Sequence, residues 1–382
     1  MKLRIMNYKL CIIHFALCIL LYGCRGDIIV YPSENEQHGD SISTSYTGFY
    51  LLNEGNMGSN KATLDFYDFS TATYTRNLYS ERNPSVPLSL GDVGNDLRIY
   101  GNRLYAVINV SNKIEVMTAD SALRIGQINI PNCRYLTFDG QYGYITSYAG
   151  PIQIGKQHAQ IGYVARFDTA TLLITDTCLV GYQPDGLCIL GDKLYVANSG
   201  GYMSPDYETT LSVINLSTFK EEQRIEVTPN LHYVHADRYG NLWVSSRGNY
   251  AERPSRLYCV SPDRQLVIDS VDAPVSNFCI EGDSLYFFGE QFNWETLQDE
   301  TFYGIVDITT HQLLTDNFIT DDTRLQKPYG IAINPATSDI LLTDAKDYVT
   351  PGTLYCLGID GKQKWQVRTG DIPAHFAFLK KQ

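Results

Sequence analysis

The chain repeats one short pattern of apolar and polar positions. A strand-like apolar run is followed by a turn of glycine, aspartate or asparagine, and then by a second strand that opens with Leu-Tyr or a similar pair. Apolar runs bounded by such turn residues are typical of β-strands. Successive copies lie 39 to 55 residues apart, a spacing typical of propeller blades. The marker residues of the seven copies are Tyr50, Tyr105, Tyr144, Tyr195, Trp243, Tyr286 and Leu341.

Each copy continues with two more strands. The third ends at an Asp, Asn or Pro turn, as at residues 211–215, and the fourth is more polar, as at residues 221–227. Four strands in each of seven copies predict an all-β fold, a seven-bladed β-propeller, over residues 46–382. The first copy lacks an innermost strand, and the apolar residues 373–378 supply one. We therefore expect the C-terminal strand to close the first blade and hide two open sheet edges.

The first 45 residues have a different character. Basic residues precede an almost unbroken apolar run at residues 10–21, which has the length of a signal-peptide core and is too short to span a bilayer. The run ends in Leu-Tyr-Gly-Cys24, which resembles a bacterial lipobox. We expect a lipoprotein signal peptide at residues 1–23, a diacylated Cys24 and a flexible polar tether over residues 24–45. A plain secretory signal followed by a chance cysteine is the alternative.

Composition narrows the function classes. An apolar content of 44% with 19% charged residues excludes wholesale disorder. The net charge of −12 argues against nucleic acid as a partner, because nucleic-acid-binding surfaces gather lysine and arginine. The 28 tyrosines favour strands. The cysteines after Cys24 lie in apolar runs without Cys-x-x-Cys spacing, so we expect buried thiols and neither a zinc site nor a disulfide framework.

One face of the expected ring collects the candidate binding residues. In a propeller, the turn before each innermost strand and the loop after each second strand lie on the same face, around the central channel. Aromatic rings beside amides, carboxylates and arginine form a platform that suits a large, neutral ligand with amide or hydroxyl groups. Alternatively, these tyrosines fill the space between blades and the polar residues only make turns. The candidates are Asn95, Asp96, Arg134, Tyr148, Asp185, Tyr202, His232, Arg247, Tyr250, Asn277, Trp294, Tyr329, Tyr348 and His375.

The sequence shows no clear catalytic signature. No His-Glu-x-x-His or Gly-x-Ser-x-Gly motif stands out, so we expect neither catalytic residues nor a metal site. A metal-dependent hydrolase remains an alternative, since seven-bladed lactonases place Glu, Asn and Asp around the channel. Asp96, Asp185 and Asn277 stand at roughly comparable places here.

Several segments resemble the YncE-like propeller lipoproteins of gut Bacteroidetes, and among them most closely the BtuG type. The resemblance covers residues 46–382, and its segments are residues 53–60, 92–96, 198–202, 245–250 and 368–375. It implies an outer-membrane lipoprotein that faces the cell exterior and touches the membrane through its lipid anchor only. It also implies that the protein is not an enzyme and has no cofactor.

The same resemblance implies a ligand and a partner. Proteins of the BtuG type capture cobalamin and its relatives and pass them to a TonB-dependent outer-membrane transporter, so cobalamin or cobinamide is the expected cargo. A corrinoid is a broad disc rimmed with amides, which matches an aromatic and amide-rich face. His232 and His375 are the two histidines that could reach the cobalt. A glycan- or protein-binding surface module is a further alternative, because aromatic platforms serve those ligands equally well.

Overall fold

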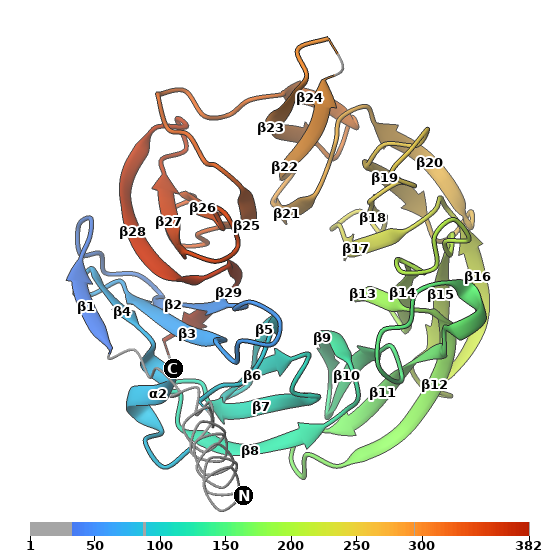
Figure 1. Cartoon of the computed structure of the whole chain (residues 1–382), viewed down its shortest axis with the longest axis horizontal. Coiled ribbons are helices and arrows are strands. Elements are labelled where there is room, and N and C mark those ends of the chain that lie inside the picture. Colours follow the sequence, from blue (N-terminus) through green and yellow to red (C-terminus); the bar gives the residue numbers. More distant parts are fainter. Residues whose placement is uncertain (1–32, 87–88, 294, 382) are drawn as a thin grey trace, which may run out of the picture. The chain divides into compact units, whose positions relative to one another are not determined.

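Seven antiparallel sheets make up the part of the chain that the computed structural model describes, residues 33–86, 89–293 and 295–381. The sheets are the blades of a seven-bladed β-propeller and follow one another around a central channel (Figure 1). The innermost strand of each blade contacts that of the next, and the last contacts the first. The fold prediction is therefore confirmed, including four strands per blade and closure of the first blade by the C-terminal strand.

The first four blades span residues 34–226 and the C-terminal strand. Blade 1 contains β1 (Glu34–Gln37), β2 (Tyr46–Asn53), β3 (Thr63–Asp68), β4 (Thr73–Arg76) and β29 (Pro373–Lys380). Blade 2 contains β5 (Gly94–Tyr100), β6 (Arg103–Ile108), β7 (Lys113–Thr118) and β8 (Arg124–Asn129). Blade 3 contains β9 (Cys133–Asp139), β10 (Tyr142–Ser147), β11 (Ile161–Asp168) and β12 (Ile174–Tyr182). Blade 4 contains β13 (Pro184–Leu190), β14 (Lys193–Asn198), β15 (Thr210–Asn215) and β16 (Lys220–Glu226).

The remaining three blades repeat the same strand order. Blade 5 contains β17 (Leu231–Ala236), β18 (Leu242–Ser246), β19 (Arg256–Ser261) and β20 (Leu266–Val271). Blade 6 contains β21 (Asn277–Glu281), β22 (Ser284–Asn293), β23 (Gln298–Asp307) and β24 (Gln312–Thr315). Blade 7 contains β25 (Pro328–Ile333), β26 (Ile340–Asp344), β27 (Pro351–Leu357) and β28 (Gln363–Asp371). Two short helices, α2 (Leu78–Arg82) and the 3₁₀ helix Lys156–His158, lie in connections. No described helix is long and apolar enough to cross a bilayer.

The core consists of seven apolar clusters, one between each pair of neighbouring blades. Successive residues of a strand point to opposite faces, so each second strand feeds two clusters. In β2, for example, Phe49 and Leu51 pack against blade 7, while Tyr50 and Leu52 pack against blade 2. Because both faces are buried, the sequence of β2 is a continuous apolar run rather than an alternating one. The tyrosines that mark the repeat are thus core residues in most blades.

Part of the expected tether is an ordered strand, which differs from the flexible segment that the sequence suggested. Residues 34–37 form β1, which pairs with β4 as a fifth strand of blade 1. The Tyr67 hydroxyl donates a hydrogen bond to the His38 carbonyl oxygen, and Ile42 packs in the cluster between blades 7 and 1. Arg76 forms ion pairs with the glutamates of β1. These polar side chains failed to signal a strand because an edge strand needs only one covered side. The expected signal peptide and Cys24 lie outside the described residues.

Candidate ligand-binding face

Antiparallel pairing brings the two predicted groups of loops together. The start of each innermost strand lies beside the end of the second strand, as in the pairs Pro184 with Asn198 and Leu231 with Ser246. In both blades a β-bulge follows directly, at Asp185 and at His232. A bulge bends its strand and re-aims side chains, which is why bulges are common beside functional sites. The structure thus places these side chains where the sequence predicted them, at the mouth of the channel.

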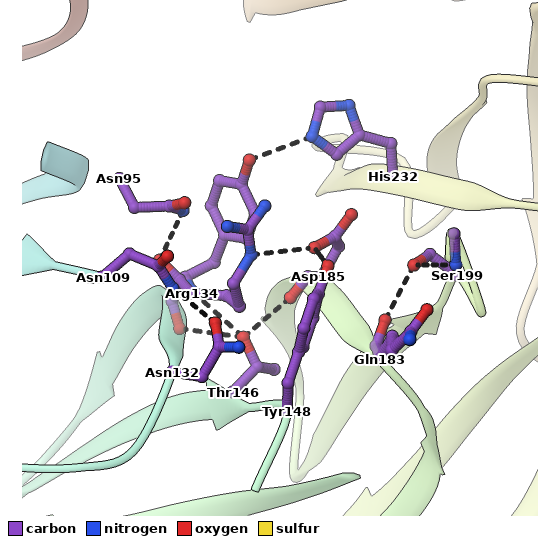
Figure 2. A network of polar contacts seen from close by, with 12 residues as sticks. Asn95, Asn109, Asn132, Arg134, Thr146, Tyr148, Gln183, Asp185, Ser199 and His232 are labelled. Atoms are coloured by element: carbon purple, nitrogen blue, oxygen red, sulfur yellow. Dashed lines mark hydrogen bonds and ion pairs between the residues drawn. The ribbon is translucent and has the colours of Figure 1, made fainter. Parts of the chain in front are cut away.

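Hydrogen bonds tie the loops of this face to the turns below them. The Asn109 amide donates to the side-chain oxygen of Asn132 at 2.6 Å, and the Ser199 hydroxyl donates to the Gln183 carbonyl oxygen at 2.8 Å (Figure 2). Asn132 and Gln183 both have left-handed backbones, with φ of 43° and 48°. Asparagine is among the residues that tolerate this region best. The loops that carry the candidate residues are therefore held in fixed positions.

A buried carboxylate lies at the centre of the mouth. Asp185 is fully buried and accepts hydrogen bonds from Arg134 Nε at 3.2 Å and the Tyr148 hydroxyl at 2.6 Å (Figure 2). It also accepts one from Arg247 Nη1 at 2.8 Å. The Arg134 guanidinium also lies over the Tyr148 ring, 5.0 Å from its centroid. We call these four residues the Asp185 cluster. They come from three consecutive blades, so the tertiary fold alone brings them together.

The charges of the Asp185 cluster stabilise one another. Burial by itself would raise the pKa of Asp185, but Arg247 and Arg134 outweigh burial and hold that pKa well below its ordinary value. Burial raises the pKa of Tyr148, and the two arginines oppose the rise only in part. Asp185 is therefore ionised and Tyr148 is a neutral donor at neutral pH. The cluster holds two guanidinium groups against one carboxylate.

His232 is bound to a residue that the sequence did not single out. Its Nε2 lies 2.9 Å from the hydroxyl of Tyr135, which stands in β9, two blades away. A Cβ atom on Gly186 of the intervening strand would lie 2.6 Å from the His232 carbonyl oxygen, so glycine lets the backbone of β17 pack closely there. Burial, followed by Arg247, lowers the pKa of His232 well below its ordinary value, so the imidazole is neutral. The repeat would have revealed Tyr135, because it directly follows Arg134 as Asp96 follows Asn95.

A second polar cluster occupies the other side of the mouth. Glu54, directly after β2, accepts a hydrogen bond from the Tyr329 hydroxyl at 2.8 Å and lies 3.1 Å from His375 Nε2. We call these three residues the Glu54 cluster. The sequence predicted Tyr329 and His375 at the mouth but did not select Glu54. Its position directly after a second strand, equivalent to those of Tyr148 and Arg247, was the available signal.

Three predicted residues brace neighbouring blades instead of facing the mouth freely. The Asn95 amide donates to the Arg134 carbonyl oxygen at 2.8 Å, and Asn277 donates to the Tyr329 carbonyl oxygen at 3.1 Å. Asp96 accepts from the Leu136 amide at 2.9 Å and from Arg98. Except for the bond with Arg98, which lies within β5, each contact joins the innermost strands of adjacent blades. The polar atoms of these residues therefore stabilise the contacts between blades. The sequence alone could not distinguish this structural role from ligand binding.

Exposed tyrosines lie around the two clusters. Tyr202, Tyr250 and Tyr348 are 42%, 73% and 40% exposed. More generally, the loop after the second strand of every blade carries an exposed large apolar side chain. We call this ring the apolar rim, and its members are Met57, Val110, Ile154, Tyr202, Tyr250, Leu297, Tyr348 and Val349. Trp294, the remaining candidate, lies outside the described residues.

The described residues contain no group of three or more His, Cys, Asp or Glu side chains that could hold a metal ion. Asp96, Asp185 and Asn277, the donors considered for a hydrolase, each hold a different set of protein partners. Further along the channel, a pocket of about 250 Å³ lies between β5, β9, β13 and β17 and is lined by residues such as Arg98, Phe138 and His235. The mouth above it is occupied by the two clusters.

Comparisons with known proteins agree with the fold. A family model described as "Domain of unknown function (DUF5074)" matches residues 47–354, and no curated protein matches the chain. The chain is similar to a quinonprotein alcohol dehydrogenase-like protein from Bacteroides thetaiotaomicron, at 14% identity and a TM-score of 0.61 over 89% of this chain and 80% of that one. It is also similar to Kuenenia stuttgartiensis hydrazine synthase, at 13% identity and a TM-score of 0.56 over 73% and 86% of the two chains. At these identities the likeness shows the fold alone, whereas the family match covers most of the propeller, and the chain therefore belongs to the DUF5074 family.

Proposed function

We propose that this protein is a cell-surface lipoprotein that captures cobalamin or a related corrinoid and delivers it to a TonB-dependent outer-membrane transporter. The observation that carries the proposal is the filled channel mouth. The residues of the Asp185 cluster bond to one another, and so do those of the Glu54 cluster. The face is therefore a broad platform ringed by exposed tyrosines rather than a deep, narrow pocket. Such a platform favours a wide ligand over a small one.

The chemistry of the platform matches a corrinoid. The ligand is a wide disc whose edge carries amide groups, and exposed phenol rings provide flat apolar area together with a hydroxyl that can bond an amide. Tyr202, Tyr250 and Tyr348 project from three different blades, so they can contact the edge of one disc at several points. The loops of this face are already held by hydrogen bonds, so ligand binding would cost less conformational entropy.

The apolar rim supports delivery to a partner. Exposed apolar side chains that gather on one face are a mark of protein interaction surfaces, and here they surround the mouth on all seven blades. A transporter that received the ligand would have to cover this same face. The lipobox-like sequence that ends at Cys24 is consistent with an anchor in such a cell envelope. The hydrolase alternative gains no support from the separate partners of Asp96, Asp185 and Asn277.

Calorimetry on the propeller, from residue 33 onward, tests the proposal. We expect cyanocobalamin to bind, and Tyr250→Ala to weaken binding roughly ten-fold, the effect of one aromatic contact residue. Tyr239→Ala is the matched control: Tyr239 is 52% exposed but lies in the β17–β18 turn, on the opposite face. Absence of binding heat with cyanocobalamin and with cobinamide would contradict the proposal. A glycan array and an esterase assay with a chelator then separate the alternatives.

A further inference from the structure

Two arginines share a single carboxylate at the channel mouth. Arg134 Nε and Arg247 Nη1 bind opposite oxygens of Asp185, so the Asp185 cluster carries one positive charge more than negative. The whole chain has a net charge of −12, which makes a surplus of positive charge at this place unusual. We infer that the mouth contains a subsite for one anionic group, and that a phosphate ester is the class it fits. The identity of the whole ligand rests on the proposed function.

The arginines retain donors for such a group. A guanidinium has five N–H donors, and each arginine gives only one of its nitrogens to Asp185. Neither guanidinium makes a further side-chain hydrogen bond to a described residue, and the side chains of Arg134 and Arg247 are 15% and 31% exposed. Both can therefore be reached from the face. The Tyr148 ring beneath Arg134 holds that guanidinium in place before a ligand arrives.

Positively and negatively charged side chains lie on different sides of the mouth. On the side of blades 3 to 5 stand Arg134, Arg247 and the neutral His232, with Asp185 between the arginines. On the side of blades 1 and 7 stands the Glu54 cluster, whose only carboxylate faces Tyr329 and His375. Further charges are paired elsewhere: Asp96 with Arg98, and Lys327 with Glu290. The anionic group of a ligand should therefore lie next to the arginines, and its hydrogen-bond donors should lie next to Glu54.

A phosphodiester fits this polarity better than a neutral group does. It carries one negative charge and two free oxygens, which match the paired donors of a guanidinium. Cobalamin has such a phosphodiester in its nucleotide loop, whereas cobinamide lacks it, and both carry amide groups that can donate to Glu54. If the proposed function holds, the subsite orients cobalamin on the face and separates it from cobinamide.

The test compares these two ligands in phosphate-free buffer. For the unaltered protein we expect cobalamin to bind roughly ten-fold or more tightly than cobinamide, the range of one charge-assisted hydrogen bond, and added salt to shrink the difference. Arg247→Gln should weaken cobalamin binding much more than cobinamide binding and so remove most of the difference, whereas Arg247→Lys, which keeps the charge, should retain part of it. Arg238→Gln is the matched control, because Arg238 of blade 5 also pairs with an aspartate of a neighbouring blade, Asp283 of blade 6, but lies on the opposite face.

Two results would overturn the subsite. One is equal affinity of the unaltered protein for both ligands; the other is an equal loss for both ligands in Arg247→Gln, which indicates a merely structural role. If neither corrinoid binds, the proposed function fails, and inorganic phosphate becomes the probe. Phosphate should then raise the melting temperature of the unaltered protein and of Arg238→Gln above that in chloride of equal ionic strength. If Arg247→Gln responds to phosphate as the other two do, the inference is wrong.

Discussion

Charged side chains at the mouth bind one another because burial leaves them no alternative. An ion that is removed from water must be paired and hydrogen-bonded, or its desolvation is too costly. Asp185 meets this requirement through two arginines and a tyrosine hydroxyl. The sequence marked all four residues as candidates for one face, but it contained no sign that they contact each other, because they are separated by up to 113 residues (247 − 134).

The lowered pKa values of two channel histidines determine how stability depends on pH. Burial, with a smaller effect of Arg98, lowers the pKa of His235 to about 4, and the pKa of His232 is lowered as well. The unfolded chain has histidine pKa values of about 6.5, so below that pH it binds protons that the folded chain does not. The stabilising contribution is complete above pH 6.5 or so and is lost as the pH falls towards 4.

Urea unfolding at about pH 7.5 and pH 5 measures this effect. The free energy of unfolding should be lower at pH 5, and His235→Phe should reduce the drop, because phenylalanine fills the ring position beside Phe278 without titrating. Asp185 does not interfere, since its depressed pKa acts only below the ordinary carboxyl range. An identical drop in the variant would contradict the assignment.

Burial of both faces determines which strands can be recognised in the sequence. The second strand of each blade has apolar residues at successive positions, as in Phe49–Leu52, because it lies between two clusters, and this made the repeat visible. The edge strand β1 is polar and paired on one side only, so the same criterion missed it. Glycine is needed where innermost strands cross closely. A Cβ atom on Gly186 would lie 2.6 Å from the His232 carbonyl oxygen and 3.0 Å from the Tyr233 Cα atom.

Gly186→Ala should therefore destabilise the protein by about 1–3 kcal/mol, the range for an overpacked site, because the atoms it meets belong to the backbone and cannot rotate away. Thermal or urea unfolding measures the loss. Gly126→Ala in the outer strand β8 is the control, because the nearest atom there is a leucine methyl at 3.4 Å. It should leave stability unchanged or slightly raised. Equal behaviour of the two variants would show that the crossing is not tight.

The whole ring depends on its closure. β29 pairs with β2 in blade 1, and it also contacts β25 of blade 7 and β5 of blade 2. The two ends of the propeller domain are joined by this one strand, and without it the buried faces of blades 1 and 7 would be open. β1, by contrast, adds to the outer edge of an already complete blade.

A chain that ends at residue 372 should therefore lose cooperative unfolding in calorimetry and the near-ultraviolet circular dichroism of packed aromatic rings. A synthetic peptide of residues 373–382 should restore part of both, since strand addition to an open sheet edge supplies its hydrogen bonds. A chain that lacks residues 33–38 is the control and should melt cooperatively, only somewhat earlier. If loss of β29 changes the melting temperature no more than loss of β1 does, closure is not what holds the ring.

The sequence by itself determined the all-β class, the seven blades, the closing strand and the face on which the candidate residues meet. These follow from local patterns, since turn residues and strand burial are written into neighbouring positions and are then repeated. The tertiary structure alone decided which candidates are free. Asn95, Asp96 and Asn277 brace the ring, the arginines surround Asp185, and three of the predicted tyrosines are exposed on the face. Contacts between side chains of different blades depend on distances that no local pattern encodes.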